Sequence, residues 1–267
     1  MKTCLSIAGS DCSGGAGIQA DLKAFSANRA FGMSVIASVV AENTSRVLSI
    51  FDLPVSCVES QIDAVFEDIT VDAVKIGMLS NAQIMRAAAR RLAKYRPPYI
   101  VLDPVMTAKG GSALMEPQAL AILREELVPL CTLITPNIPE AQEITGDTIH
   151  SPADMKRAAV KIKELGAECV LIKGGHLEGD ALDILYDGTA CYEFREERIK
   201  TKNTHGTGCT LSSAITANLA NGMCMKDAVE TAKGYVTRAI RHSLPIGKGY
   251  GPTNHFYEFY RMKGWIK

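Results

Sequence analysis

Short apolar runs alternate with longer segments of helical periodicity along most of the chain. The apolar runs are nearly continuous and rich in β-branched residues, which is typical of strands buried in a parallel sheet. The predicted strands are 4–8, 33–40, 73–79, 99–105, 131–134 and 169–173. The predicted helices between them are 18–30, 63–69, 82–95, 117–128 and 152–165. This alternation predicts an α/β fold whose mostly parallel central sheet carries helices on both faces.

The last third of the chain departs from this alternation. Segments 183–186 and 190–194 are joined by Asp187-Gly188, which predicts a hairpin and therefore a small antiparallel addition at the sheet edge. Two long helical patterns, 209–221 and 226–243, come next, and a glycine- and proline-rich segment and a short aromatic tail follow them. No internal repeat or linker interrupts the pattern, so we expect a single domain over residues 1–267.

Composition narrows the class of protein. The 29 Lys and Arg residues balance 29 Asp and Glu residues, which argues against nucleic acid or an acidic membrane surface as the main partner. The eight cysteines include no C-x-x-C spacing, so we expect reduced thiols. The first apolar run is shorter than we expect of a signal peptide, and no apolar run approaches the ~20 residues of a membrane span. We therefore expect a cytoplasmic protein.

The first strand runs into a glycine-rich loop, Gly9 to Gly17, and then into a helix. This arrangement brings a ligand close to the backbone at the carboxyl end of a strand. The loop matches neither the dinucleotide fingerprint nor a Walker loop. Asp21 alone is best interpreted as a helix-cap residue, and Glu42 lies either at a pocket mouth or at an exposed strand end.

A second glycine loop, 201–210, leads into the first of the two long helices. Gly206 and Gly208 separate small polar residues there, so several N–H groups can converge at a helix N-terminus and bind an anion. Cys209 follows them, and the helix dipole would favour either a bound anion or the thiolate form of this residue. Without further evidence, an ordinary glycine turn would explain the same stretch.

Other strand ends carry groups suited to phosphate chemistry. Asp103 ends one strand, and Lys173 precedes a double glycine at the end of another. Asn137 and Glu140 stand three apart at a helix start, which suits either two oxygen ligands of Mg²⁺ or a capping box. Together these groups favour phosphoryl transfer. A thiol enzyme with Cys209 as nucleophile and His205 as base is the competing interpretation, but it leaves Lys173, Asn137 and Glu140 without a role.

Six ordered motifs resemble the bacterial hydroxymethylpyrimidine/phosphomethylpyrimidine kinases of thiamin biosynthesis, which have the ribokinase-like fold. The resemblance runs in register from the first strand to the final helices. The motifs are Ala8-Gly-Ser-Asp-Cys-Ser-Gly-Gly-Ala-Gly-Ile-Gln-Ala-Asp-Leu-Lys23, Lys75-Ile-Gly-Met-Leu79, Leu102-Asp-Pro-Val105, Thr135-Pro-Asn-Ile-Pro-Glu-Ala141, Lys173-Gly-Gly-His176 and Lys202-Asn-Thr-His-Gly-Thr-Gly-Cys-Thr210.

The resemblance implies that ATP, with Mg²⁺, phosphorylates 4-amino-5-hydroxymethyl-2-methylpyrimidine and then its monophosphate to the diphosphate. It implies an anion hole at Gly206, Thr207, Gly208 and Cys209. A thiol of lowered pKa could accept the proton there, or the helix dipole and the N–H donors alone could suffice, because a loose transition state asks little of a base. Asp103 and Glu140 would lie near the metal and the phosphates. The expected nucleotide-side residues are Asn137, Lys173, His205 and Lys233.

The pyrimidine site maps by the same resemblance to Gly9, Asp21, Glu42 and Met78. Several family members have glutamine where this chain has Glu42; a carboxylate only accepts hydrogen bonds, whereas an amide also donates. Glu42 could still bind the exocyclic amino group and a protonated ring nitrogen.

The alternative activity is that of a pyridoxal or pyridoxine kinase, and a non-catalytic ligand-binding domain is an alternative of another class. The resemblance also implies a homodimer. The glycine-rich segment 107–112 is the predicted lid.

Overall fold

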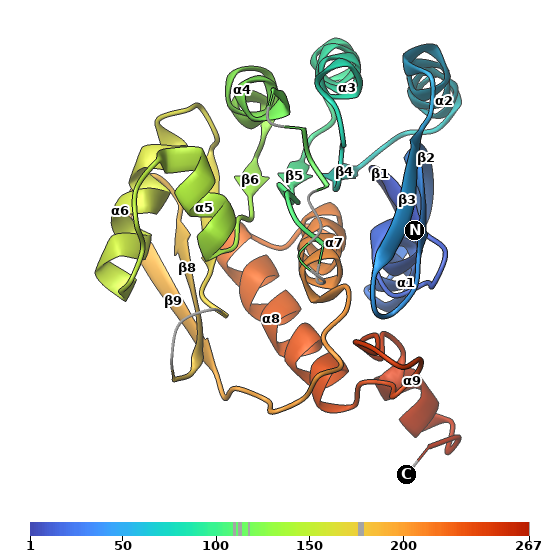
Figure 1. The fold of residues 1–267 in the computed structure, drawn as a ribbon, viewed down its shortest axis with the longest axis vertical. Coiled ribbons are helices and arrows are strands. Elements are labelled where there is room, and N and C mark those ends of the chain that lie inside the picture. Colours follow the sequence, from blue (N-terminus) through green and yellow to red (C-terminus); the bar gives the residue numbers. More distant parts are fainter. Residues whose placement is uncertain (109–110, 112–113, 117, 176–178, 267) are drawn as a thin grey trace.

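A computed structural model describes residues 1–108, 111, 114–116, 118–175 and 179–266, and within these residues it contains one sheet of nine strands (Figure 1). The strands lie in the order β3-β2-β1-β4-β5-β6-β7-β8-β9. Strands β2, β1, β4, β5, β6 and β7, which are neighbours in that order, are parallel to one another. Strands β3, β8 and β9 are each antiparallel to the preceding strand in the chain. Their bounds are β1 Lys2–Asp11, β2 Ala30–Glu42, β3 Val47–Asp52, β4 Ala73–Ile76, β5 Ile100–Leu102, β6 Leu133–Ile134, β7 Cys169–Lys173, β8 Ala181–Tyr186 and β9 Cys191–Glu196.

Helices cover both faces of this sheet, as the alternating pattern predicts. Helices α2 to α6 share one apolar core with the strands, and α1, α7 and α8 pack on the opposite face (Figure 1). A π-helical turn, Leu123–Leu127, and a 3₁₀ turn, Val128–Leu130, continue α4. The helix bounds are α1 Gly17–Ala27, α2 Val55–Asp68, α3 Ala82–Tyr95, α4 Ala119–Ile122, α5 Ile138–Thr145, α6 Pro152–Lys163, α7 Thr207–Ala220, α8 Met225–Arg241 and α9 Tyr257–Met262.

Helix α7 is the most enclosed of these elements. Every residue from Thr210 to Ala220 is buried, because α1 and α8 flank the helix and the sheet lies beneath it. Its first turn meets the carboxyl ends of the parallel strands. Ligands of open α/β sheets bind at that edge, so the fold presents the start of α7 to any bound substrate.

Three predictions around β2 and β3 were wrong. The sequence pattern gave no strand at β3, and its helix extended to Ala30, which instead begins β2. Strand β2 is also not buried on both faces, since Val39 is 47% exposed beside the edge strand β3. The predicted hairpin at the other edge is confirmed as β8 and β9.

Among the described residues, no helix has the length and apolar character needed to cross a bilayer.

Candidate active site

The two glycine loops lie directly against each other at the carboxyl edge of the sheet. Gly206 is the N-cap of α7 and has φ +72°, a left-handed conformation that favours glycine. A Cβ atom at this position would lie 1.8 Å from the Gly15 carbonyl oxygen. A Cβ atom at Gly15 would in turn lie 2.3 Å from His205 Cδ2, so both glycines are required for the loops to approach this closely.

The start of α7 forms the predicted anion cradle, which we define as residues 206–209. Helix α7 begins at Thr207, so the N–H groups of Gly208 and Cys209 lie in the first turn, where helices have no internal acceptors. A Cβ atom at Gly208 would lie 3.4 Å from both Asp103 Oδ2 and Lys173 Nζ. The cradle thus faces a lysine and a carboxylate that are distant from it along the chain.

Lys173 and Asp103 form a close ion pair at the ends of β7 and β5. Lys173 Nζ lies 2.6 Å from Asp103 Oδ1, and the Thr135 hydroxyl donates to the same oxygen. Burial lowers the pKa of Lys173, but the negative charge of Asp103 outweighs this effect and the pKa is raised overall. Asp103 Oδ2 is buried and has no hydrogen-bond partner among the residues that the structure describes. This oxygen faces the cradle with unused capacity to accept.

Asn137 and Glu140 form a complete capping box at the start of α5. The Asn137 side chain accepts from the Glu140 amide at 2.9 Å, and Glu140 Oε2 accepts from the Asn137 amide at 2.8 Å. The capping interpretation is therefore confirmed. Burial and the nearby Asp103 charge raise the pKa of Glu140, while Lys173 opposes them. A divalent cation would offset the repulsion between the Glu140 and Asp103 carboxylates and would be coordinated by the unpartnered Asp103 oxygen. The residues present therefore fit a magnesium ion.

The thiol of Cys209 contradicts our expectation of a lowered pKa. Burial raises its pKa to about 11, and the nearby Lys75 ammonium only partly opposes that effect. The helix dipole is worth less than the loss of solvation, so the thiol is protonated at neutral pH. The competing thiol-enzyme interpretation also weakens, because the His205 imidazole hydrogen-bonds to Asp11 rather than facing Cys209 as a base.

Asp11 closes the first glycine loop. Its Oδ1 accepts from the Ser13 amide at 2.7 Å, and its Oδ2 accepts from the Gly15 and Ala16 amides and from His205 Nε2, at 2.9, 2.7 and 2.9 Å. Although burial alone would raise it, these donors hold the pKa of Asp11 well below its usual range. The structure thus places His205 against the glycine loop, whereas the resemblance grouped it with the nucleotide ligands.

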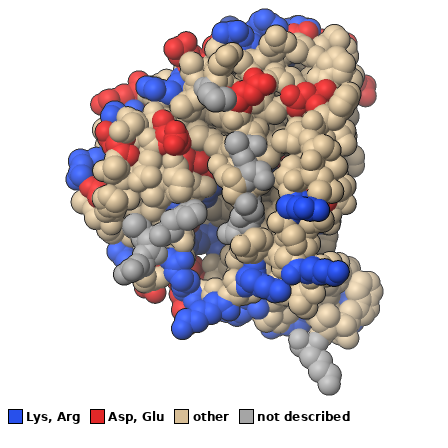
Figure 2. Space-filling model, in the orientation of Figure 1, with Lys and Arg blue, Asp and Glu red and all other residues tan. Residues whose placement is uncertain are grey.

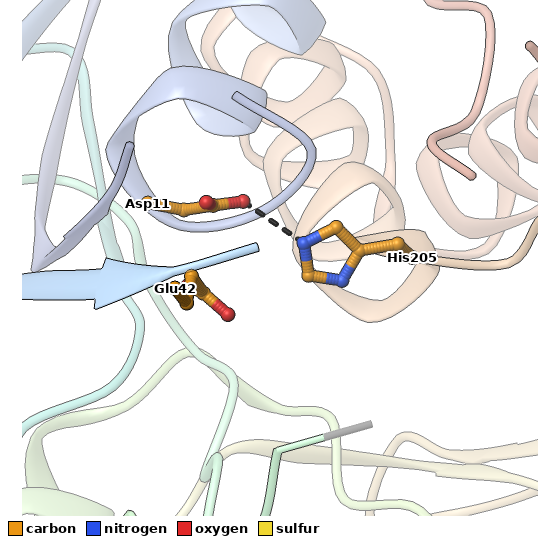
Figure 3. A group of neighbouring side chains, drawn as sticks. All are labelled: Asp11, Glu42 and His205. Atoms are coloured by element: carbon orange, nitrogen blue, oxygen red, sulfur yellow. Dashed lines mark hydrogen bonds and ion pairs between the residues drawn. The ribbon is translucent and has the colours of Figure 1, made fainter. Parts of the chain in front are cut away.

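Glu42 completes a group of three titratable side chains (Figure 3). One ligating atom each from Asp11, Glu42 and His205 lies within 4.8 Å of the others, and Figure 3 shows the three groups gathered from β1, β2 and the loop that leads into α7. Burial and the negative charge of Asp11 raise the pKa of Glu42 to about 7. Asp11 already accepts four hydrogen bonds, so we assign Asp11 and His205 to shaping the loop rather than to binding a metal.

Gly9 and Met78 lie together, whereas Asp21 lies apart in the interior. Gly9 donates to the Met78 carbonyl at 3.1 Å, and a Cβ atom at Gly9 would lie 2.5 Å from the Met78 terminal methyl group. Asp21 is fully buried within α1 and does not cap it. Both Asp21 oxygens are engaged by Lys75, so we revise its predicted role from a pyrimidine contact to a supporting one.

Two further predictions fall at the periphery of the site. Lys233 of α8 lies 2.7 Å from Asp183 and donates to the Ala181 carbonyl, so its charge ties α8 to β8. The predicted lid, 107–112, lies partly outside the described residues, which include 107, 108 and 111 of it. Figure 2 shows this face of the molecule hollowed near its middle, with Lys and Arg side chains along the lower rim.

The sequence interpretation missed Lys75 and the role of Asp11. A lysine within the apolar run 73–79 was the available signal, because lysines are rarely fully buried unless they are paired. For Asp11, the signal was a carboxylate followed by a run of small residues whose amides can turn back toward it.

Residues 11–254 match the family model described as phosphomethylpyrimidine kinase. The chain is 50% identical over 252 residues to the thiamine biosynthesis bifunctional protein ThiED of Geobacter sulfurreducens, covering 94% of this chain and 51% of that protein. It is 47% identical to the hydroxymethylpyrimidine/phosphomethylpyrimidine kinase of Bacillus subtilis, covering 94% of each chain. The chain thus spans about half of the bifunctional relative and nearly all of the other.

Solved structures share this fold. An ADP complex of Bacillus subtilis pyridoxal kinase has a TM-score of 0.91 and 41% identity, covering 97% of this chain and 99% of that one. The phosphomethylpyrimidine kinase of Clostridium difficile has a TM-score of 0.81 and 49% identity, covering 90% of this chain and 100% of that one.

Proposed function

Because the chain belongs to the phosphomethylpyrimidine kinase family, we propose that this single domain transfers phosphate from ATP to hydroxymethylpyrimidine and then to its monophosphate. The observation that carries the proposal is the arrangement around Gly208. There, the start of α7, the Lys173 ammonium and an unpartnered oxygen of Asp103 converge within the described residues. Such a set suits a transferring phosphoryl group, which needs hydrogen-bond donors, a cation and a metal.

On this proposal the cradle and Lys173 stabilise the negative charge that builds up on the phosphoryl oxygens. The N–H groups of Gly208 and Cys209 donate to these oxygens, and Lys173, which lies beside Gly208, neutralises their charge. Asp103 and Glu140 would hold Mg²⁺, which supplies positive charge to the phosphates when bound. Lys233 acts on the nucleotide side by keeping α8 in place against β8.

The ring of the substrate lies, on this proposal, among Gly9, Met78 and Glu42. The absence of a side chain at Gly9 leaves room for the Met78 methyl group beside the ring. The protonated thiol of Cys209 borders the substrate hydroxyl without taking its proton, because a loose phosphoryl transition state asks little of a base. His205 and Asp11 fix the loop on which this end of the site rests.

Pyridoxal is the second candidate substrate, because a pyridoxal kinase shares this fold at a TM-score of 0.91. Both substrates are small heteroaromatic rings with a hydroxymethyl arm, so the cradle itself does not distinguish them. The test is ATP consumption by the purified chain with Mg²⁺ and hydroxymethylpyrimidine, its monophosphate or pyridoxal. Turnover of both pyrimidines supports the proposal. Preference for pyridoxal, without use of the pyrimidine monophosphate, would overturn it.

We also propose that the chain acts as a cytoplasmic homodimer. Val39 and Phe51 face each other across β2 and β3, and both are exposed, as is Leu48 nearby. An apolar strip at a sheet edge suits a second copy of the chain. Light scattering should give a dimer, and Phe51→Glu should give a monomer; a monomeric unaltered chain would refute this part. The eight cysteines are free thiols, in keeping with a reducing compartment.

A further inference from the structure

A second lysine–aspartate pair lies in the interior against α7, the helix that begins with the cradle. Lys75 Nζ is 2.8 Å from each oxygen of Asp21, and both side chains are fully buried. Ser6 of β1 and Ser213 of α7 donate to the same carboxylate at 2.6 and 2.8 Å. The pair therefore joins β1, α1, β4 and α7, which are the elements that converge at the two glycine loops.

The ammonium group of Lys75 reaches up to the carboxyl edge of the sheet. A Cβ atom at Gly77, two residues further along, would lie 2.6 Å from Lys75 Nζ. The Asp21 and Asp103 carboxylates both act on this lysine, and the Cys209 side chain lies within range of its charge. Of the two members of the pair, Lys75 has the larger effect on the pKa of Cys209 and lowers it, so the ammonium group is the member turned toward the start of α7.

We propose that Lys75, held by Asp21, is a positioning residue for phosphoryl transfer, which orients the first turn of α7 and keeps the floor of the anion cradle positive. This inference rests on the proposed phosphotransferase function and adds a second cation to it. Lys173 lies beside Gly208 of the cradle, whereas Lys75 is fully buried against Asp21 and does not touch substrate.

The buried ion pair of Lys75 and Asp21 is not explained by stability alone. Removing two charges from water is costly, and apolar or neutral replacements of buried ion pairs often leave stability unchanged or increase it. A buried ammonium group near developing negative charge has a strong effect, because the interior screens it weakly. A variant with neutral side chains at both positions should therefore fold normally and have a lower rate of phosphoryl transfer.

The test replaces the pair with neutral side chains of similar size, Lys75→Met with Asp21→Asn. We expect kcat to fall about tenfold or more, with the KM values for ATP and for the acceptor within about twofold of the unaltered chain. The thermal midpoint should stay close to that of the unaltered chain. Unchanged kcat in the folded double variant would overturn the inference.

The matched control is Lys2→Met with Asp72→Asn. Lys2 and Asp72 form a 2.6 Å ion pair next to the same two strands, at the end away from the cradle. This control should leave kcat unchanged, and an equal loss of kcat in both double variants would show that the effect is not specific to the cradle.

A milder variant covers the case in which the double variant fails to fold. Ser213→Ala removes only the hydroxyl that links α7 to Asp21, and Thr216→Val removes a buried hydroxyl one turn along that bonds to the Ser212 carbonyl. We expect Ser213→Ala to lower kcat several-fold more than Thr216→Val. Equal effects of the two would overturn the inference. Each comparison uses whichever acceptor the unaltered chain phosphorylates, so it is independent of the pyrimidine assignment.

Discussion

Replacing Glu42 with glutamine should stabilise the protein at alkaline pH and much less at acidic pH. The pKa of Glu42 is raised from an ordinary 4.5 to about 7 by burial and by the Asp11 charge. A raised pKa means that the native chain binds the proton more tightly than the unfolded chain does. Stability therefore falls as the pH rises from 4.5 to 7, and the loss is complete above the native pKa.

The size of the effect follows from that difference. A pKa change from 4.5 to about 7 corresponds to about 3 kcal/mol at 1.36 kcal/mol per unit. Glu42 is only half-buried, and solvent screening reduces the expected gain to about 1–2 kcal/mol. Glutamine has a similar shape and stays neutral, so Glu42→Gln recovers this free energy only where the native carboxyl would be ionised.

Urea unfolding of both chains at about pH 5 and about pH 8.5 measures the difference directly. The gain in the free energy of unfolding should be larger at the higher pH by about 1–2 kcal/mol. Glu67→Gln, on the exposed side of α2, is the control and should show no such pH dependence. An equal gain from Glu42→Gln at both pH values would refute the crowding of Glu42 by Asp11.

Three further changes test the cradle. Cys209→Ala should lower kcat by no more than about tenfold, because loss of a true general base costs roughly 10²–10⁴-fold in steady-state kinetics; a larger loss would restore the thiol as base. Lys173→Met should lower kcat by about 10²–10³-fold, whereas the surface change Lys161→Met should not, and equal kinetics for the two would remove Lys173 from the site. Gly206→Ala should destabilise the chain in urea by more than Gly222→Ala, since both have positive φ but a Cβ atom meets the first glycine loop at 1.8 Å only at Gly206. Equal losses would contradict this contact.

The fold class was predictable because burial imposes simple periods on the sequence. Residues 82–95 show this well: the expected bounds match α3 because apolar positions recur at helical spacing and Asn81 caps the start. Strand β3 was missed because an edge strand with one open face needs no continuous apolar run. Its partner β2 looked doubly buried, although Val39 faces outward.

The site was predictable as a set of strand ends but not as a set of contacts. Periodicity indicates that Asp103 and Lys173 end parallel strands, and such ends meet at one edge. It cannot show that they pair at 2.6 Å, or that His205 turns toward Asp11, because those contacts depend on loop conformation. The prediction of a lowered pKa for Cys209 was wrong for a similar reason, since the local helix dipole can be inferred from the sequence and the depth of burial cannot.

The long-range contacts of the site also determine the stage of chain synthesis at which it can form. His205 meets Asp11 across 194 positions of sequence, and Ser213 meets Asp21 across 192. A nascent chain that has left the ribosome only as far as β7 therefore has both aspartates but neither of these partners. Contacts of such long range form late and slowly. Catalytic competence should thus emerge during synthesis only after α7 has been released and has packed against α1 and the sheet.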